Sequence, residues 1–341
     1  MKKEGRTAAF FAALAGLTVA VLVLALSLGD VSYSPVRVCR LIGSALLGAE
    51  DTSLEAVILL RLRLPRVILG LIVGGGLAVS GVIFQGLFRN PLVEPYTLGV
   101  SGGAALGVSL GFIVGPIFPR FALPLFGFAG AWLAVSLAYA IARRRRILRI
   151  PYLLLIGVMI SFVSSSLIML LLSVADLHRF RAVIYWTMGS LDAADPGVLV
   201  FAVPVIVFGS AAALTRAWTL NALELGEEGA IGLGVRLRRD QRRLFFLGSL
   251  LAGTAVSVAG VIGFVGLVVP HVVRLFIGND HRATIPASFI AGGTFLVFCD
   301  LIARTVRAPA ELPVGVVSGI LGGGLFIYFL ASGRGRGLSG Q

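Results

Sequence analysis

The sequence predicts an all-α membrane protein with about ten transmembrane helices. Of its 341 residues, 57% are hydrophobic and only 13% are charged, and the mean hydropathy is +0.99. A water-soluble domain of this length needs more charge to cover its surface, so lipid must cover much of this one. Nine stretches lack Asp, Glu, Lys and Arg, and most are long enough to cross a hydrocarbon core of about 30 Å as a single helix. These stretches are Thr7–Gly29, Val67–Phe88, Pro95–Pro119, Phe121–Ala142, Ile150–Ala175, Pro196–Thr215, Leu244–Val273, Ala283–Cys299 and Leu312–Gly333.

The first stretch follows a short basic N-terminus that runs from Met1 to Arg6. Secretory signal peptides share that charge order, but the apolar stretch that follows is too long for a signal-peptide core. We therefore interpret Thr7–Gly29 as an uncleaved first span whose N-terminus is cytoplasmic.

Residues 30–66 then form a segment on the outer face, with a short helix inside it. Ser34 is suited to cap this helix, and Pro35 is suited to its first turn. Val38 and Leu41 fall on its apolar face. The pattern is typical of a helix that lies on the outer membrane surface, and a loop packed against the bundle is an equal alternative.

The third stretch carries a glycine at every fourth position. This spacing places the glycines along one ridge of a helix, where a second helix can approach closely. The pattern predicts a many-helix bundle and says nothing about cargo. The glycines are Gly99, Gly103, Gly107, Gly111 and Gly115.

The stretch Leu244–Val273 is too long for one straight span. Gly260, Gly263 and Pro270 interrupt it, so two shorter helices joined near Gly260–Gly263 fit better and raise the total from nine spans to ten. With ten spans, 19 of the 29 Lys and Arg residues face the cytoplasm, against 17 with nine. Because cytoplasmic loops are enriched in Lys and Arg, ten spans are favoured.

Enzyme and metal signatures are scarce. Lys2 and Lys3 are the only lysines, so a GxxxxGK[ST] phosphate-binding loop cannot be present and any ATP must be bound by another subunit. His178, His271 and His281 are scattered without metal-ligand spacing. The sequence therefore predicts a membrane protein that is not an enzyme and has no ATP site of its own, with no catalytic residue, metal site or cofactor.

Charged residues keep to the ends of the apolar stretches. A transporter driven by an ion gradient is expected to place ionisable ligands well inside its spans. Such a secondary transporter is therefore the weaker alternative to a transporter powered from outside the chain.

Residues 220–235 have the composition of a docking surface on the cytoplasmic face. Two short helical turns separated by glycine would present apolar and acidic side chains together, and small apolar patches ringed by charge are typical of protein interfaces. An ordinary solvated connection would not need so many apolar side chains. The residues in question are Leu223, Glu224, Leu225, Glu227, Glu228, Ile231 and Leu233.

Seven longer motifs occur in order along the chain. They are Leu62–Arg66 (LRLPR), Ser80–Leu92 (SGVIFQGLFRNPL), Glu94–Val100 (EPYTLGV), Leu223–Glu227 (LELGE), Gly263–Arg274 (GFVGLVVPHVVR), Asp280–Arg282 (DHR) and Glu311–Gly315 (ELPVG). With these motifs the chain resembles the permease subunits of binding-protein-dependent ABC importers for iron-siderophores, haem and cobalamin. The resemblance covers nearly the whole chain.

The resemblance implies one transmembrane domain over residues 1–341, a ten-helix bundle like that of cobalamin-importer permeases. It implies a homodimer around a central path, two cytosolic ATP-binding subunits and an external substrate-binding protein. The location implied is the inner (plasma) membrane, with both termini cytoplasmic. The cargo would be an iron chelate, haem or a cobalamin-type compound, moved inward by alternating access.

The resemblance also assigns roles to particular residues. Arg63, Arg66 and Arg304 match outer-face arginines that receive glutamates of the binding protein, although headgroup anchoring would suit them as well. Asn90 and Leu92 match residues that narrow the path on the cytoplasmic side. The ATPase-coupling residues implied are Leu223, Glu224, Leu225, Gly226, Glu227 and Gly234.

The chain departs from the family pattern in two places. Gly322–Phe326 reads GGGLF where the family often has Gly-Ala-Pro before the last Phe, and Ile150–Tyr152 lacks the small polar residues of a second gate, so none is assigned. A further hypothesis places the residues between Asp176 and Asp192, including Phe180, Trp186 and Met188, at the outer mouth of the path.

Overall fold

The computed structural model describes residues 2–29, 31–48, 51, 53–114, 122–144, 150–192 and 194–332. Within this part of the chain every regular element is a helix. The helices are α1 (Lys2–Ser27), α2 (Pro35–Leu46), α3 (Leu54–Val57), the π-helix η1 (Ile58–Arg63), α4 (Leu64–Phe88), the 3-10 helix η2 (Pro95–Leu98), α5 (Val100–Val114), α6 (Leu123–Arg144), α7 (Ile150–Ser173), α8 (Leu177–Thr187), α9 (Pro196–Thr215), α10 (Ala217–Glu224), α11 (Glu227–Gly232), α12 (Leu237–Ala259), α13 (Val265–Ile277), α14 (His281–Thr305) and α15 (Val314–Ala331).

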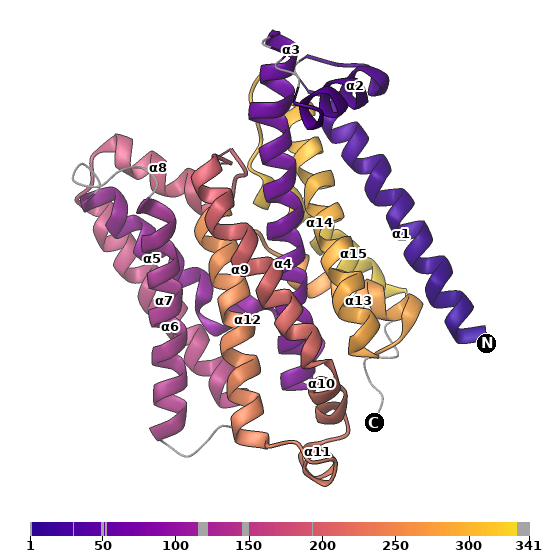
Figure 1. Ribbon diagram of the computed structural model, residues 1–341. Helices are drawn as coiled ribbons and strands as arrows, with labels where there is room; N and C mark the ends of the chain where they lie inside the picture. Colours follow the sequence, from indigo (N-terminus) through magenta and orange to yellow (C-terminus); the bar gives the residue numbers. More distant parts are fainter. Residues whose placement is uncertain are drawn as a thin grey trace.

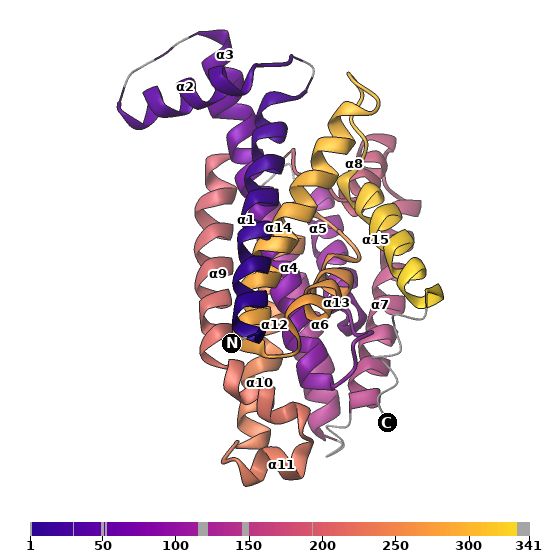
Figure 2. The ribbon, with the colours of Figure 1, turned by 90° about the vertical axis from the view of Figure 1, so that its right-hand side faces the viewer.

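Most of these helices run side by side in one elongated bundle (Figure 1). Helices α2 and α3 extend beyond it at one end, and α10 and α11 extend beyond it at the other (Figure 2). We refer to these as the α2 end and the α10 end. Both ends carry residues to which the sequence assigns a role.

Seven helices of the described residues are long and apolar enough to cross a membrane. Three shorter apolar helices, over Val100–Val114, Val265–Ile277 and Val314–Phe329, accompany them. Together these ten helices correspond to the ten predicted spans. In the third predicted stretch the α-helix is shorter than expected. Its first residues form the 3-10 helix η2, and the α-helix α5 covers Val100–Val114. Residues 115–119 lie outside the described residues.

The predicted interruption of Leu244–Val273 is confirmed. Helix α12 ends at Ala259 and α13 begins at Val265, and Gly260 has a φ of 71°, a left-handed conformation that glycine adopts without steric cost. The Tyr96 hydroxyl donates to the Ile262 carbonyl at 2.7 Å, and the Phe264 N–H donates to the Glu94 carboxylate at 2.7 Å. The loop after α4 therefore supplies partners for backbone that the break leaves without helical hydrogen bonds.

Helix α4 is the central element of the bundle. It is buried along nearly its whole length, and it packs against α9, α12, α13 and α14. Glycines make the closest approaches possible, since a Cβ added at Gly74 would collide with the Gly292 carbonyl and one at Gly81 with the Gly266 carbonyl.

The predicted glycine ridge is confirmed in part. A Cβ at Gly103 would collide with Gly130 of α6, and one at Gly107 would collide with the Phe126 carbonyl. Gly99 is not on the helix, because it precedes α5 with a φ of 83°. Gly115 lies outside the described residues.

The short helix predicted after the first span is α2. The Ser34 hydroxyl accepts the Arg37 N–H at 3.3 Å, and Pro35 is the first helical residue. Val38 and Leu41 are buried in a small core shared with α1, η1 and the start of α4. The apolar face of α2 thus packs on the bundle, whereas Val36 is 68% exposed.

Candidate functional site at the two ends of the bundle

The predicted coupling segment forms two short helices, α10 and α11, at the tip of the α10 end (Figure 1). Gly226 between them and Gly234 after them have φ values of 95° and 83°, so each turn uses a conformation that favours glycine. This agrees with the two short turns that the sequence pattern predicts.

The side chains of this segment divide into an inner and an outer set. Leu223 is buried against the bundle, so its part in the segment is to anchor α10. Leu225 is 69% exposed and Ile231 is 57% exposed, beside the exposed Glu227 and Glu228. The outer set is thus an apolar patch ringed by carboxylates, a composition suited to protein docking.

Polar contacts hold α10 against the start of α14. The Asn221 amide donates to the Asp280 carboxylate at 2.8 Å, and its oxygen accepts the His281 backbone N–H at 2.9 Å. The hydrogen bond from Asn221 is the main reason why the pKa of Asp280 is lowered. Burial raises the pKa of Glu224 at the end of α10.

The two residues expected at the cytoplasmic gate lie just after α4. Arg89 ends that helix with a φ of 49°, and the Asn90 side-chain oxygen accepts the Leu92 N–H at 2.9 Å. Leu92 is 54% exposed while Val93 is buried. The turn therefore presents Leu92 at the surface of the single chain.

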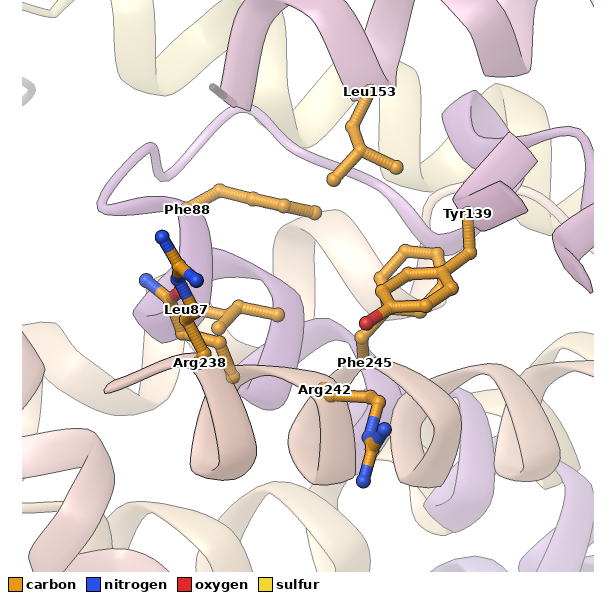
Figure 3. A pocket seen from close by; sticks show the side chains of 8 residues that line it. Leu87, Phe88, Tyr139, Leu153, Arg238, Arg242 and Phe245 are labelled. Carbon is orange, nitrogen blue, oxygen red and sulfur yellow. The ribbon is translucent and has the colours of Figure 1, made fainter. Parts of the chain in front are cut away.

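A small pocket lies near this turn, between α4, α6, α7 and α12 (Figure 3). The rings of Tyr139 and Phe245 lie side by side in it, with centroids 5.8 Å apart, and Arg238 and Arg242 border it. Its volume of about 30 Å³ has room for about two water molecules. It is too small to take a chelate.

The three arginines predicted to dock the binding protein lie near the α2 end. Arg63 and Arg304 are buried, and Arg66 is 14% exposed. Arg63, in the π-helix η1, donates to the carbonyl oxygens of Leu26 at 3.0 Å and Ser27 at 3.4 Å, and also to that of Val31. Its guanidinium lies 5.1 Å from the centre of the Tyr33 ring. Its hydrogen-bonding capacity is thus largely used inside the chain.

Arg66 is the centre of an ion-pair cluster that the sequence analysis did not predict. Its guanidinium lies 2.8 Å from the Asp300 carboxylate, 2.6 Å from that of Asp192 and 2.8 Å from that of Glu311. Arg304 completes the cluster, 3.2 Å from Asp300, and it also donates to the Ala25 carbonyl at 2.6 Å. We call these five residues the arginine cluster.

The sequence analysis gave two expectations for the arginines at these positions, docking of the binding protein and anchoring to lipid headgroups, and the arginine cluster bears on both. Arg66 lies in the first turn of α4, and Asp300 and Arg304 lie near the end of α14, as expected, whereas Asp192 and Glu311 come from loops. Arg66 and Asp300 are only 14% and 2% exposed, so they face protein. Arg61 and Arg307, a few residues away in the chain, are exposed. Docking by Arg63, Arg66 and Arg304 stays a prediction, and it would require exchange of partners within the chain.

A larger cavity lies at the same end, between α5, α6, α8, α9 and α12. Its volume is about 1140 Å³. Of the residues expected at an outer mouth, Trp186 lines it, whereas Phe180 and Met188 do not. Asp176, Arg179 and Asp192 line it as well. Because Asp192 also pairs with Arg66, the cavity borders the arginine cluster.

A bundle of apolar helices long enough to cross a membrane, with exposed apolar side chains at one end and a cavity at the other, has the architecture expected of a polytopic membrane permease. Comparisons with known proteins give the same class. The chain belongs to the FecCD transport family, whose model matches residues 17–332.

The similar proteins are permeases of ABC importers. The chain is 40% identical over 308 residues to the hemin transport system permease protein HmuU of Yersinia pestis, covering 86% of this chain and 92% of that one. It is 41% identical over 283 residues to the cobalamin import system permease protein BtuC of Halobacterium salinarum, covering 83% and 75%. A solved inward-facing structure of a metal-chelate type ABC transporter superposes with a TM-score of 0.84, at 30% identity over 95% of this chain and 98% of that one. The chain is therefore a permease subunit of the ABC-importer class.

Proposed function

We propose that this chain imports a metal chelate, either an iron-siderophore, haem or a cobalamin-type compound, across the inner (plasma) membrane. Two copies form a homodimer around a central path, with both termini of each copy cytoplasmic. An external substrate-binding protein delivers the cargo, and two cytosolic ATP-binding subunits power alternating access. The permease itself binds no ATP.

The observation that carries the proposal is the outer set of the coupling segment. Leu225 and Ile231 are exposed to solvent in the isolated chain, and they lie at two short helices that extend beyond the bundle. Exposed apolar side chains ringed by Glu227 and Glu228 are suited to a groove on a soluble partner. An ATP-binding subunit seated there would push on α10 when it binds ATP.

At the α2 end, the proposal assigns Arg63, Arg66 and Arg304 to the binding protein. Carboxylates of the binding protein would replace Asp192 and Glu311 at the Arg66 guanidinium, since these two are the more exposed of its partners, at 59% and 37%. Arg63 and Arg304 are more deeply buried. They would not contact the binding protein first but would add positive charge close to the Arg66 guanidinium, where the carboxylates are exchanged. Asn90 and Leu92 would narrow the path at the cytoplasmic side.

The test is a reconstitution of this chain in lipid with its cognate ATPase. ATP hydrolysis is measured with and without the candidate binding protein, for the native permease and for the double variant Arg63→Glu, Arg66→Glu. We expect the binding protein to stimulate hydrolysis in the native complex and not in the variant. Stimulation that survives in the variant contradicts the docking assignment, and failure of any ATPase to associate contradicts the ATP-driven importer.

A competition assay identifies the cargo class in the same liposomes. Uptake of labelled ferric siderophore, labelled haem and labelled cobalamin is measured in separate experiments, each with and without an excess of the same unlabelled compound. We expect one of the three to be taken up and to be displaced by its unlabelled form, and the other two not to be taken up. Equal competition by free metal salts would contradict a chelate as the cargo.

A further inference from the structure

A cluster of polar side chains lies between the coupling segment and the end of α4. It consists of Gln85 on α4, Asn221 and Glu224 on α10, Arg274 on α13, and Asp280 and His281 at the start of α14. We call these six residues the polar cluster. Gln85 and His281 are 3% and 0% exposed, Asn221 and Arg274 are half-buried, and Glu224 and Asp280 are exposed. The inference drawn from this cluster rests on the coupling role proposed above for residues 220–235.

On the α10 side, Asn221 binds three groups at the start of α14. In addition to the bonds to Asp280 and to the His281 N–H, its oxygen lies 2.7 Å from His281 Nδ1. Asp280 is itself the N-cap of α14, because its carboxylate accepts the Arg282 N–H at 3.0 Å. A single amide therefore fixes α10 to the first turn of α14, and α10 cannot move alone without breaking these bonds.

On the α4 side, Gln85 joins α4 to α13. Arg274 Nη1 donates to the Gln85 side-chain oxygen, and Gln85 Nε2 donates to the Gly266 carbonyl at 3.1 Å and the Leu267 carbonyl at 3.3 Å. The backbone carbonyl of Gln85 accepts the Asn90 N–H at 3.2 Å. The side chain of Gln85 thus bonds to α13, and its main chain bonds to the turn that carries Asn90 and Leu92. We call this turn the gate turn.

The two sides meet in the middle of the polar cluster. Glu224 Oε1 lies 3.9 Å from His281 Nδ1, and the charges of Glu224 and Arg274 attract each other. A Cβ at Gly86 would lie 2.8 Å from His281 Nε2, so the backbone of α4 touches the imidazole ring. Contacts therefore run without a gap from α10 through α14 and α13 to the last turn of α4.

A second contact links the same two regions directly. A Cβ built at Gly226 would lie 3.4 Å from Arg89 Nη1. Arg89 is the residue that ends α4, immediately before Asn90. The coupling segment therefore touches the gate turn at its first residue as well as through the polar cluster.

We propose that Asn221, Arg274 and Gln85 are positioning residues that transmit displacement of the coupling segment to the turn that carries Asn90 and Leu92. Buried polar groups leave their partners only at the cost of unmet hydrogen bonds. Gln85 and His281 are the buried members of the cluster, so the arrangement of partners around these two has few intermediate states. When an ATP-binding subunit pushes α10, the first turn of α14, the α13 side chains and the last turn of α4 move with it. The gate turn then follows, because its first N–H bonds end on Gln85.

The test separates transmission from ordinary packing. The variants Asn221→Ala and Gln85→Leu are reconstituted with the ATP-binding subunits and the binding protein, and substrate uptake is measured per ATP hydrolysed. We expect uptake per ATP to fall at least about fivefold, the low end of ordinary coupling between two sites, while hydrolysis continues. Thr215→Ala is the matched control at the same end, because that exposed hydroxyl bonds only the Ala212 carbonyl of its own helix.

A distance measurement gives a readout that a packing defect would not move. Leu92→Cys is introduced where Cys39 and Cys299 have been replaced by Ser and Ala, and spin labels report the separation of the two copies with and without ATP. We expect an ATP-dependent change with Asn221 present and none in Asn221→Ala. If Asn221→Ala prevents assembly, Asn221→Asp serves instead: it retains the acceptor oxygen but has lost the donor to Asp280.

Two results overturn the proposal. One is an unchanged uptake per ATP, whether or not the amount of assembled complex falls, since that is the behaviour of a merely structural contact. The other is a full ATP-dependent distance change at position 92 in the Asn221 variants. A native complex that takes up no substrate with ATP would instead contradict the proposed function, so the two failures are distinguishable.

Discussion

Replacement of Asp300 by Asn tests the physical basis of the arginine cluster. The Asp300 carboxylate is 2% exposed and neutralises both Arg66 and Arg304. Removal of one partner from a buried ion pair costs about 3–5 kcal/mol, because a charge is left buried without compensation. Arg66 keeps Asp192 and Glu311, and Arg304 keeps the Ala25 carbonyl. We therefore expect the low end of that range, about 3 kcal/mol.

The assay is unfolding of the purified chain by a denaturing detergent, followed by its tryptophan fluorescence. Asp192→Asn is the matched control, because it makes the same chemical change on the same arginine at a side chain that is 59% exposed. Exposed ion pairs contribute about 0–1 kcal/mol. Equal losses of unfolding free energy in the two variants would refute the reasoning, since burial would then have no influence on the strength of the pairs.

Three further changes probe the helix contacts, the docking surface and the outer helix. Gly81→Ala places a methyl group against the Gly266 carbonyl, and we expect a loss of about 1–3 kcal/mol in the free energy of unfolding from overpacking. Leu225→Arg adds charge to a side chain that is 69% exposed, so it should weaken co-purification of the ATP-binding subunit and leave unfolding of the chain unchanged. Ser34→Ala removes the N-cap of α2 and should cost about 1 kcal/mol, seen as faster hydrogen exchange confined to residues 35–46.

Each of the three has a control or a contradicting result. Gly16→Ala is the control for the glycine change, because a Cβ at Gly16 meets nothing within 4 Å; equal destabilisation would contradict the close-approach account. Undiminished co-purification with Leu225→Arg would remove this leucine from the docking surface. Unchanged exchange in α2 after Ser34→Ala would show that packing of Val38 and Leu41 alone maintains the helix.

The sequence predicted the features that depend on local chemistry. The break near Gly260 follows from glycine spacing, the start of α2 follows from Ser34 and Pro35, and the two turns of the coupling segment follow from Gly226 and its neighbours. In each case the signal and the structure lie within a few residues of each other.

The arginine cluster could not be predicted in the same way. Its carboxylates come from positions 192, 300 and 311, and only the fold brings them to Arg66. The one local signal was the spacing of four between Asp300 and Arg304, which places both on one face of a helix. The polar cluster has a similar origin, since Asn221 and His281 are 60 residues apart in the chain. The family resemblance assigned roles to the arginines but could not show that they face inward.

The most direct test of the central claim is substrate uptake into liposomes that contain this chain, its ATP-binding subunits and its binding protein. The account predicts uptake that requires ATP inside the compartment where the ATP-binding subunits lie and that persists when ionophores collapse all ion gradients. Uptake that needs no ATPase and stops when the ionophores are added would contradict it, and would make the chain a carrier driven by an ion gradient.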